Sequence, residues 1–338
     1  MTDAPVRVGI VGSGFMGSTH AAAWRAEGVA VTIFAPDPDR AAATAADTGA
    51  STARTLDELL ERVDIVDVCT PTDAHTPIVL AAAAAGRHVV CEKPLALSVP
   101  DAEAMIAACE AAGVHLFVAH VLRYVAEYAL AKAIVDRGDI GRPAVIKLKR
   151  AAFRPQKPAG HWLFDPARSG GMAFDLTIHD IDFARWIAGD VVRVYAWSAG
   201  TEHPERPVDH AFLTLTHASG AITQIVGSWA YGPPTFRTRL EIAGSHGLID
   251  HDSERAQPLL SFLHATPDSG QGAVGIAKSL SRDDPFRDQL RDFLGAIVDG
   301  HQPRVTARDA LEAVRIGFAC NESARTGRAV DVASGGVG

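Results

Sequence analysis

Short apolar runs alternate with amphipathic stretches along the first 120 or so residues. The apolar runs predict buried strands at residues 6–11, 29–34, 64–69, 88–91 and 114–119. The stretches between them predict helices from the end of a glycine-rich turn to about residue 27, then at 56–60, 75–85 and 97–112. Asp73 is the expected N-cap of the 75–85 helix. Strands that alternate with helices favour a doubly wound parallel sheet, the α/β Rossmann arrangement.

The alternation of predicted strands and helices ends after about residue 124. A helix to about residue 137 precedes an extended run at 144–153, a loop at 154–171 and a further helix. Strand-like runs without intervening helices follow at 191–198, 210–216, 221–229 and 237–243. Residues 251–280 are polar and predict a long loop or edge strand, and residues 333–338 a frayed end. Amphipathic patterns predict closing helices at 286–298 and 307–324.

These patterns predict two domains. Residues 1–122 would form a dinucleotide-binding Rossmann domain, and residues 123–338 an α+β domain for substrate binding and oligomerisation. The second domain would hold a largely antiparallel open sheet with flanking helices, because consecutive strands with no helix between them favour antiparallel pairing. The two closing helices would pack back on the first domain.

A glycine motif follows the first predicted strand and opens a helix, which is the context that gives this pattern meaning. Gly12 allows a tight turn, Gly14 lets a pyrophosphate touch the backbone, and Gly17 lets the helix pack close to the strand. The helix N-terminus offers free N–H groups to phosphates. A plain glycine turn is the alternative. The predicted cofactor-binding residues of this motif are Gly12, Ser13, Gly14, Phe15, Met16 and Gly17.

The choice between NAD and NADP depends on the end of the second strand. The position at which a ribose-binding acid is expected holds Ala35, with Asp37 two residues later. Asp37 would reach a ribose 2′-hydroxyl and favour NAD, whereas Arg40 would meet a 2′-phosphate and favour NADP. A third interpretation is that these residues only begin a helix. We expect NAD or NADP, with NAD favoured.

Other candidate ligand-binding residues follow later strands of the parallel sheet, because ligands bind outside the C-terminal ends of such strands. Thr70, Pro71 and His75 follow one strand, and Glu92 and Lys93 follow the next. A lysine at such a place is often only a solvated charge, but this one would lie where a nicotinamide ring sits.

Asp175 and His179 are four residues apart in a segment of helical pattern, so their side chains would lie on one face. Gly170 and Gly171 precede them and would let another group approach the backbone closely. A histidine can exchange a proton at neutral pH, and a neighbouring carboxylate can orient it. The alternatives are a helix cap with a structural histidine, or a metal site in which His179 is joined by Asp175, His161 or Asp182.

Composition narrows the functional classes. The net charge of −8 offers no electrostatic case for nucleic acid or an anionic membrane. No apolar run is long enough to span a bilayer, and we expect no signal peptide and a cytoplasmic protein. The four cysteines are scattered in apolar surroundings, which predicts buried thiols rather than disulfides or zinc ligands.

Together these motifs resemble the glucose–fructose oxidoreductase / inositol dehydrogenase family (Gfo/Idh/MocA). The resemblance rests on residues 8–17, on Cys69-Thr-Pro with His75, on residues 88–94 ending in Glu-Lys-Pro, and on Ser169-Gly-Gly followed by Asp175 and His179. It implies that Lys93, Asp175 and His179 form the catalytic group, and that Glu92, Thr70, Pro71 and His75 lie along the cofactor. It also implies that Trp162 borders cofactor and substrate. Ala35 departs from the family pattern.

The implied reaction is reversible hydride transfer between a nicotinamide and a carbinol carbon of a sugar, inositol or related polyol. The predicted substrate-binding residues are Lys93, Arg123, Tyr124, Arg154, His161, Asp175 and His179. An apolar sheet face in the second domain would form a homodimer or homotetramer. Two alternatives remain, an NAD(P)-binding regulatory protein without turnover and an NAD-dependent glycosidase, and we expect no metal.

Overall fold

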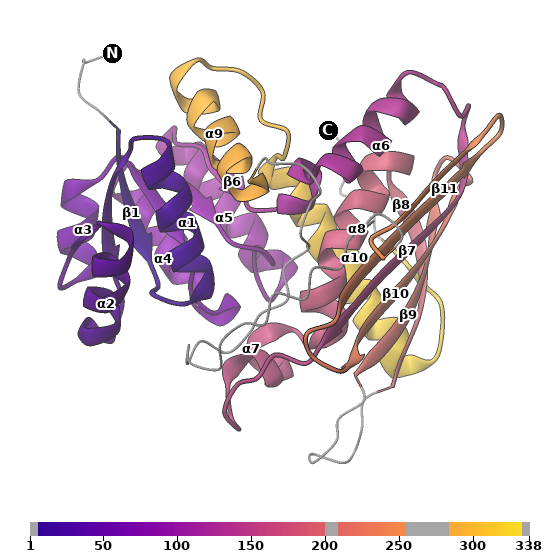
Figure 1. Ribbon diagram of the computed structural model, residues 1–338, viewed down its shortest axis with the longest axis horizontal. Helices are drawn as coiled ribbons and strands as arrows, with labels where there is room; N and C mark the ends of the chain where they lie inside the picture. Colours follow the sequence, from indigo (N-terminus) through magenta and orange to yellow (C-terminus); the bar gives the residue numbers. More distant parts are fainter. Residues whose placement is uncertain (1–5, 200–208, 255–283, 333–338) are drawn as a thin grey trace. The chain divides into compact units, whose positions relative to one another are not determined.

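The computed structural model describes residues 6–199, 209–254 and 284–332. The chain separates into two compact units (Figure 1). The described part of the first unit covers residues 6–125 and 284–314, and that of the second covers 126–199, 209–254 and 315–332. Helix α10 (Ala307–Thr326) begins in the first unit and ends in the second.

The first unit contains a six-stranded parallel sheet in the order β3-β2-β1-β4-β5-β6. This is the doubly wound arrangement that the alternating pattern predicts. Its strands are β1 (Arg7–Val11), β2 (Ala30–Phe34), β3 (Ser51–Thr52), β4 (Ile65–Val68), β5 (His88–Cys91) and β6 (Leu116–Val118). Its helices are α1 (Phe15–Ala26), α2 (Pro38–Thr48), α3 (Leu56–Arg62), η1 (Thr72–Ala74), α4 (His75–Ala84), α5 (Val99–Ala112), η2 (Val121–Tyr124) and α9 (Pro285–Val298).

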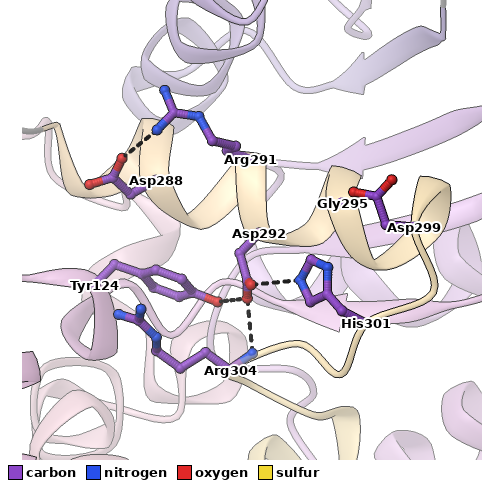
Figure 2. Close-up of a pocket in the computed structure, with 8 residues that line it drawn as sticks. All are labelled: Tyr124, Asp288, Arg291, Asp292, Gly295, Asp299, His301 and Arg304. Carbon is purple, nitrogen blue, oxygen red and sulfur yellow. Dashed lines mark hydrogen bonds and ion pairs between the residues drawn. The ribbon is translucent and has the colours of Figure 1, made fainter. Parts of the chain in front are cut away.

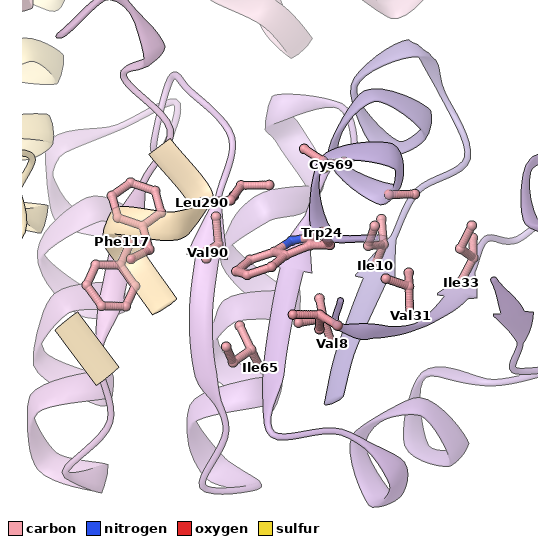
Figure 3. Packing of buried hydrophobic residues seen from close by; sticks show 14 of the residues in the cluster. Val8, Ile10, Trp24, Val31, Ile33, Ile65, Cys69, Val90, Phe117 and Leu290 are labelled. Carbon is pink, nitrogen blue, oxygen red and sulfur yellow. The ribbon is translucent and has the colours of Figure 1, made fainter. Parts of the chain in front are cut away.

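The core of the first unit lies between the sheet and helices from both ends of the sequence (Figure 3). Trp24 of α1 is completely buried, as are Val8 and Ile10 of β1. Leu290 and Phe293 of α9 belong to the same cluster, and the Phe293 ring stacks on Phe117 at 4.8 Å between centroids. Helix α9 is therefore an integral part of this unit although about 160 residues separate it from η2.

The second unit is built on a seven-stranded sheet in the order β12-β11-β7-β10-β9-β8-β13. The prediction of a largely antiparallel sheet is confirmed, but β7 and β10 pair in parallel, which the rule for consecutive strands missed. Its strands are β7 (Pro143–Phe153), β8 (Val191–Ala199), β9 (His210–His217), β10 (Ile222–Tyr231), β11 (Phe236–Gly244), β12 (Leu248–Asp252) and β13 (Val330–Asp331). Its helices are α6 (Ala126–Asp136), η3 (Trp162–Phe164), α7 (Pro166–Ser169) and α8 (Met172–Ala188).

Helix α8 packs across β7, β9 and β10. The approach is close at Gly227 of β10, where a Cβ atom would lie only 2.4 Å from the Thr177 methyl group. Arg150 of β7 also donates two hydrogen bonds to Asp180 from inside the unit. These two contacts determine which face of α8 packs on the sheet. They therefore also determine which face of α8 the sheet leaves uncovered.

The predicted helices and strands are present, with small differences at their ends, whereas the short strands β3, β12 and β13 have no predicted counterpart and α2 appears only as the helix-start alternative for Asp37. One prediction about a cap is wrong: α4 has Ala74 at its N-cap, and Asp73 lies in the preceding η1 turn. The predicted loop at 154–171 contains the short helices η3 and α7. Most of the predicted loop at 251–280 and the end at 333–338 lie outside the described residues. Among the described helices, none has the length and apolar character required to cross a bilayer.

Candidate functional site

Two glycines of the first turn have no room for a side chain. Gly12 has a φ of +115°, and a Cβ atom there would lie 2.4 Å from the carbonyl oxygen of Cys69. A Cβ atom on Gly17 would lie 2.1 Å from the carbonyl oxygen of Gly12. The turn and the start of α1 are thus pressed against β1 and the end of β4, which is the close packing that a dinucleotide-binding turn requires.

Gly14 differs from these two glycines because a Cβ atom there would meet nothing within 4 Å. Gly14 is the N-cap of α1, and no side chain caps this helix end. The N–H groups of the first helical turn therefore have no capping side chain, and such N–H groups can bind a phosphate. The residues present fit the pyrophosphate of a dinucleotide, and Gly14 is the position at which that group would touch the backbone.

Asp37 is the N-cap of α2, and its Oδ1 accepts hydrogen bonds from the N–H groups of Asp39 and Arg40, each at 3.1 Å. The helix-start interpretation therefore describes part of its role. Both bonds go to one carboxylate oxygen, so Oδ2 can still accept a bond from a ribose hydroxyl. Ala35, at the usual position of the acid, is buried.

His75 is almost completely buried. Its Nδ1 lies 3.0 Å from the carbonyl oxygen of Pro94, and its Nε2 lies 3.1 Å from that of Thr70. Burial lowers the pKa of His75. The imidazole therefore connects the loop after β4 with the loop after β5, while Thr70 and Pro71 are half-buried. Direct contact between His75 and a cofactor stays a prediction.

Glu92 and Lys93 follow β5, where the sheet ends. Glu92 is 7% exposed, and its side chain turns back so that Oε2 accepts a hydrogen bond of 3.1 Å from the Lys93 N–H. Its other oxygen, Oε1, lies 3.2 Å from Nε2 of His20. Lys93 itself is half-buried, and the Lys93–Pro94 peptide bond is cis.

Asp175 and His179 lie on the uncovered face of α8. Both are half-buried, whereas Leu176, Thr177 and Ile178 between them are buried. The helix begins after two glycines in backbone conformations that favour glycine, with φ +78° at Gly170 and +84° at Gly171. The group that approaches Gly170 is the Phe174 ring, because a Cβ atom there would lie 2.3 Å from it. Asn321 of α10 donates to the Gly170 carbonyl at 3.1 Å and holds this turn.

Three further predicted residues lie in or beside the loop that precedes α8. His161 and Trp162 are half-buried, with ring centroids 5.8 Å apart. The guanidinium of Arg154 lies 4.0 Å above the Phe164 ring and 3.3 Å from Oδ2 of Asp209. Burial raises the pKa of Asp209, and Arg154 opposes that effect. These side chains belong to the same unit as Asp175 and His179.

Arg123 and Tyr124 have structural partners within the first unit. Arg123 is 2% exposed and donates to the carbonyl oxygen of Arg304 at 2.9 Å. The Tyr124 hydroxyl donates to Asp292 at 2.6 Å, beside an open cavity of about 460 Å³ (Figure 2). Asp292 also accepts from His301 and from the Arg304 N–H, both at 2.9 Å. Substrate binding by Arg123 or Tyr124 therefore stays a prediction.

Sequence reasoning missed a buried polar cluster beneath Lys93. His20 of α1 contacts Asp67 of β4 as well as Glu92, and Trp24 donates to the same Asp67 carboxylate. The sequence nevertheless indicates this cluster, because His20 and Trp24 share the buried face of α1 and Asp67 interrupts an otherwise apolar strand.

Comparison with known proteins identifies the family. The model of the oxidoreductase family with an NAD-binding Rossmann fold matches residues 6–120, and the GFO/IDH/MocA C-terminal domain matches residues 128–250. The chain belongs to the GFO/IDH/MocA oxidoreductase family. The resemblance inferred from the motifs is confirmed, as is the prediction of a nicotinamide-dependent oxidoreductase.

Relatives of this family match nearly the whole chain. Myo-inositol 2-dehydrogenase of Thermotoga maritima is 32% identical over 96% of this chain and 98% of its own length. The structure of GenD2 from gentamicin A biosynthesis in complex with NAD has a TM-score of 0.84 and 28% identity, covering 97% of this chain and 96% of that one. Levoglucosan dehydrogenase in complex with NADH and levoglucosan has a TM-score of 0.83 and 27% identity, covering 97% and 99%.

Proposed function

We propose that this protein is an NAD-dependent dehydrogenase that oxidises a carbinol carbon of an inositol, a sugar or a related polyol to a ketone. The observation that carries the proposal is the face of α8 that the sheet does not cover. On this face a carboxylate and an imidazole, both half-buried, lie one turn apart, and most other residues of the helix are buried. The relatives named inositol and levoglucosan dehydrogenases support the substrate class.

We assign the chemistry to Lys93, Asp175 and His179. His179 takes the hydroxyl proton as the hydride leaves the carbinol carbon, because an imidazole can accept a proton in such a step. Lys93 donates to the same oxygen, and its charge stabilises the developing alkoxide. Asp175 orients His179 or binds a neighbouring hydroxyl. The bound nicotinamide supplies the hydride acceptor.

The assignment of NAD rests on Asp37. Its carboxylate lies at the end of the second strand region and keeps Oδ2 for a ribose 2′-hydroxyl, whereas it would repel a 2′-phosphate. The solved structures of two relatives in complex with NAD or NADH agree with this choice. The exposed Arg40 is the feature that would favour NADP.

The test is a substrate panel. The purified protein is mixed with NAD or NADP and with inositols, aldoses, anhydrosugars or sugar acids, and reduced cofactor is followed by its near-ultraviolet absorbance. We expect turnover with a polyol and NAD. Tight cofactor binding without turnover on every polyol would favour a regulatory protein. Release of a free alcohol from a glycoside without net reduction of the cofactor would favour a glycosidase.

We also propose that the protein acts in the cytoplasm as a homo-oligomer joined through the outer face of the sheet in the second unit. Trp197 of β8 and Phe212 of β9 are register partners on this face, and their side chains are about half exposed. Tyr195 extends the same apolar patch. A Trp197→Glu variant should therefore sediment as a smaller species than the wild type in analytical ultracentrifugation, and unchanged sedimentation would exclude this interface.

A further inference from the structure

The buried polar cluster beneath Lys93 comes from three separate parts of the first unit. His20 lies on α1, the helix that begins at the glycine turn, Asp67 lies on β4, and Glu92 lies just after β5. His20 and Asp67 are fully buried and Glu92 nearly so. Figure 3 shows the surroundings, with Trp24 and Cys69 among apolar side chains. Such a group is retained only if its members satisfy one another.

Both ring nitrogens of His20 face carboxylates. Nδ1 lies 2.9 Å from Oδ2 of Asp67, and Nε2 lies 3.2 Å from Oε1 of Glu92, an ion-pair distance outside hydrogen-bond geometry. A neutral imidazole carries one N–H group, whereas an imidazolium carries two. Two carboxylates on opposite sides of the ring therefore favour the charged form. Burial lowers the pKa of His20, while the Asp67 carboxylate beside Nδ1 raises it, and the pKa lies well above its ordinary value.

The contacts lead from His20 to Lys93 through one side chain. Glu92 contacts His20 with Oε1, and its Oε2 accepts the hydrogen bond from the Lys93 N–H. The Glu92 carboxylate is thus held between a buried cation and the backbone of Lys93. Without the cation, this carboxylate would be buried with one hydrogen bond and would turn toward water.

We propose that His20 is a positioning residue, an imidazolium between Asp67 and Glu92 that holds the Glu92 carboxylate on the Lys93 amide and thereby fixes the backbone from which the Lys93 side chain extends. The inference rests on the proposed function only where it concerns turnover. Because α1 also presents its N-terminus to the pyrophosphate, the cluster connects the helix that binds the cofactor to the residue that acts on the substrate.

A metal site is the competing interpretation of the same side chains. Ligand atoms of His20, Asp67 and Cys69 lie within 4.8 Å of one another. The Asp67 carboxylate, however, already accepts from Trp24 at 2.7 Å, from His20 and from the Cys69 thiol at 3.4 Å. Burial raises the pKa of Cys69, which favours the thiol over the thiolate that a metal needs. We therefore assign the cluster to positioning, and stoichiometric metal in the purified protein would overturn that assignment.

The first test measures the protonation state of the His20 ring in the wild-type protein by ¹⁵N NMR of labelled histidines. The His20 signal is the one that is missing in a His20→Gln variant. An unperturbed histidine is about 99% neutral near pH 8.5, two units above its reference pKa. We expect His20 to remain doubly protonated there. A neutral ring at that pH would contradict the proposal. The groups facing this ring that can titrate are Asp67, Cys69 and Glu92.

The second test measures the rate of hydrogen exchange at the backbone N–H of Lys93. In His20→Gln we expect this amide to exchange about tenfold faster, the effect of losing one hydrogen bond to a charged group. Trp24→Phe is the matched control, because it removes a donor from the same Asp67 carboxylate but leaves Glu92 untouched, and its Lys93 amide should exchange at the wild-type rate. Equal exchange in wild type and His20→Gln would overturn the proposal.

Kinetics complete the test. We expect His20→Gln to lower kcat about 100-fold, as a small displacement of a catalytic group can, with little change in the Kd for NAD. A His20→Gln/Asp67→Asn double variant removes both charges and should regain stability but not kcat, since Glu92 still lacks its cation. Recovery of kcat together with stability would show a merely structural role. If the wild type transfers no hydride, the proposed function fails, while the NMR and exchange measurements still decide the role of His20.

Discussion

Arg150 and Asp180 form a bidentate ion pair inside the second unit, with Nε and Nη2 of the arginine at 2.7 and 3.1 Å from the carboxylate oxygens. Asp180 is the residue after His179 and is buried, and successive residues of a helix point about 100° apart around its axis. The pair therefore sets the rotation of the helix about its axis, and with it the direction in which Asp175 and His179 face.

Asp180→Asn should lower the free energy of unfolding by about 3 kcal/mol, because it leaves the Arg150 guanidinium buried without its counter-charge. Urea denaturation measures this effect. The matched control is Arg150→Met/Asp180→Leu, which removes both charges and should cost clearly less. Equal losses in the single and double variants would show that apolar packing, and not the ion pair, holds α8.

Lys93→Met and His179→Ala should each lower kcat by a factor of about 100 to 10,000, the range of general acid–base help. The Kd for NAD should change little, because the proposed phosphate contacts lie at the glycine turn. Steady-state kinetics with the best polyol, together with titration of NADH fluorescence, separate the two effects. Turnover near the wild-type level in either variant would remove that residue from the catalytic group.

Substitutions of two glycines of the turn should affect folding and cofactor binding separately. Gly14→Ala should fold with wild-type stability, because a Cβ atom there has open space, yet bind NAD weakly because that space is where the pyrophosphate would lie. Gly17→Ala should unfold at lower urea, because its Cβ atom would press on the Gly12 carbonyl. Calorimetric titration with NAD and urea unfolding measure the two properties, and strong NAD binding by Gly14→Ala would contradict the assigned phosphate position.

Stability should depend on pH through His20 and His75 in opposite directions. The folded pKa of His20 is raised, so its contribution is complete below the unfolded pKa of about 6.5 and is lost as pH rises toward the folded value. The folded pKa of His75 is lowered by burial, so its contribution is present above about 6.5 and is lost as pH falls. Urea unfolding at several pH values should show the loss above 6.5 in wild type and its absence in His20→Gln.

The sequence predicts those parts of the site whose signal is local. The glycine turn, the Glu92–Lys93 pair after β5 and the spacing of Asp175 and His179 each lie within one element and its neighbouring turn. The parallel β7–β10 pairing lacks such a signal, because alternation of apolar residues marks a strand without giving its neighbours.

Long-range partners explain the remaining differences. Arg123 and Tyr124 follow a strand end and have the polar character of ligand-binding residues, but their partners, Arg304 and Asp292, lie far along the chain in the segment around α9. The contacts of His20 likewise join residues from three elements. A polar residue within a buried element is the sequence signal that would have found this cluster.

The most direct test of the account follows the hydride itself. The protein is incubated with NAD and a polyol that carries deuterium on its carbinol carbon, and the cofactor is analysed by NMR and mass spectrometry. We expect deuterium to appear at C4 of the reduced nicotinamide in step with formation of the ketone, and Lys93→Met and His179→Ala to suppress both together. Cofactor that stays unlabelled while the polyol is converted would contradict hydride transfer as the function of this protein.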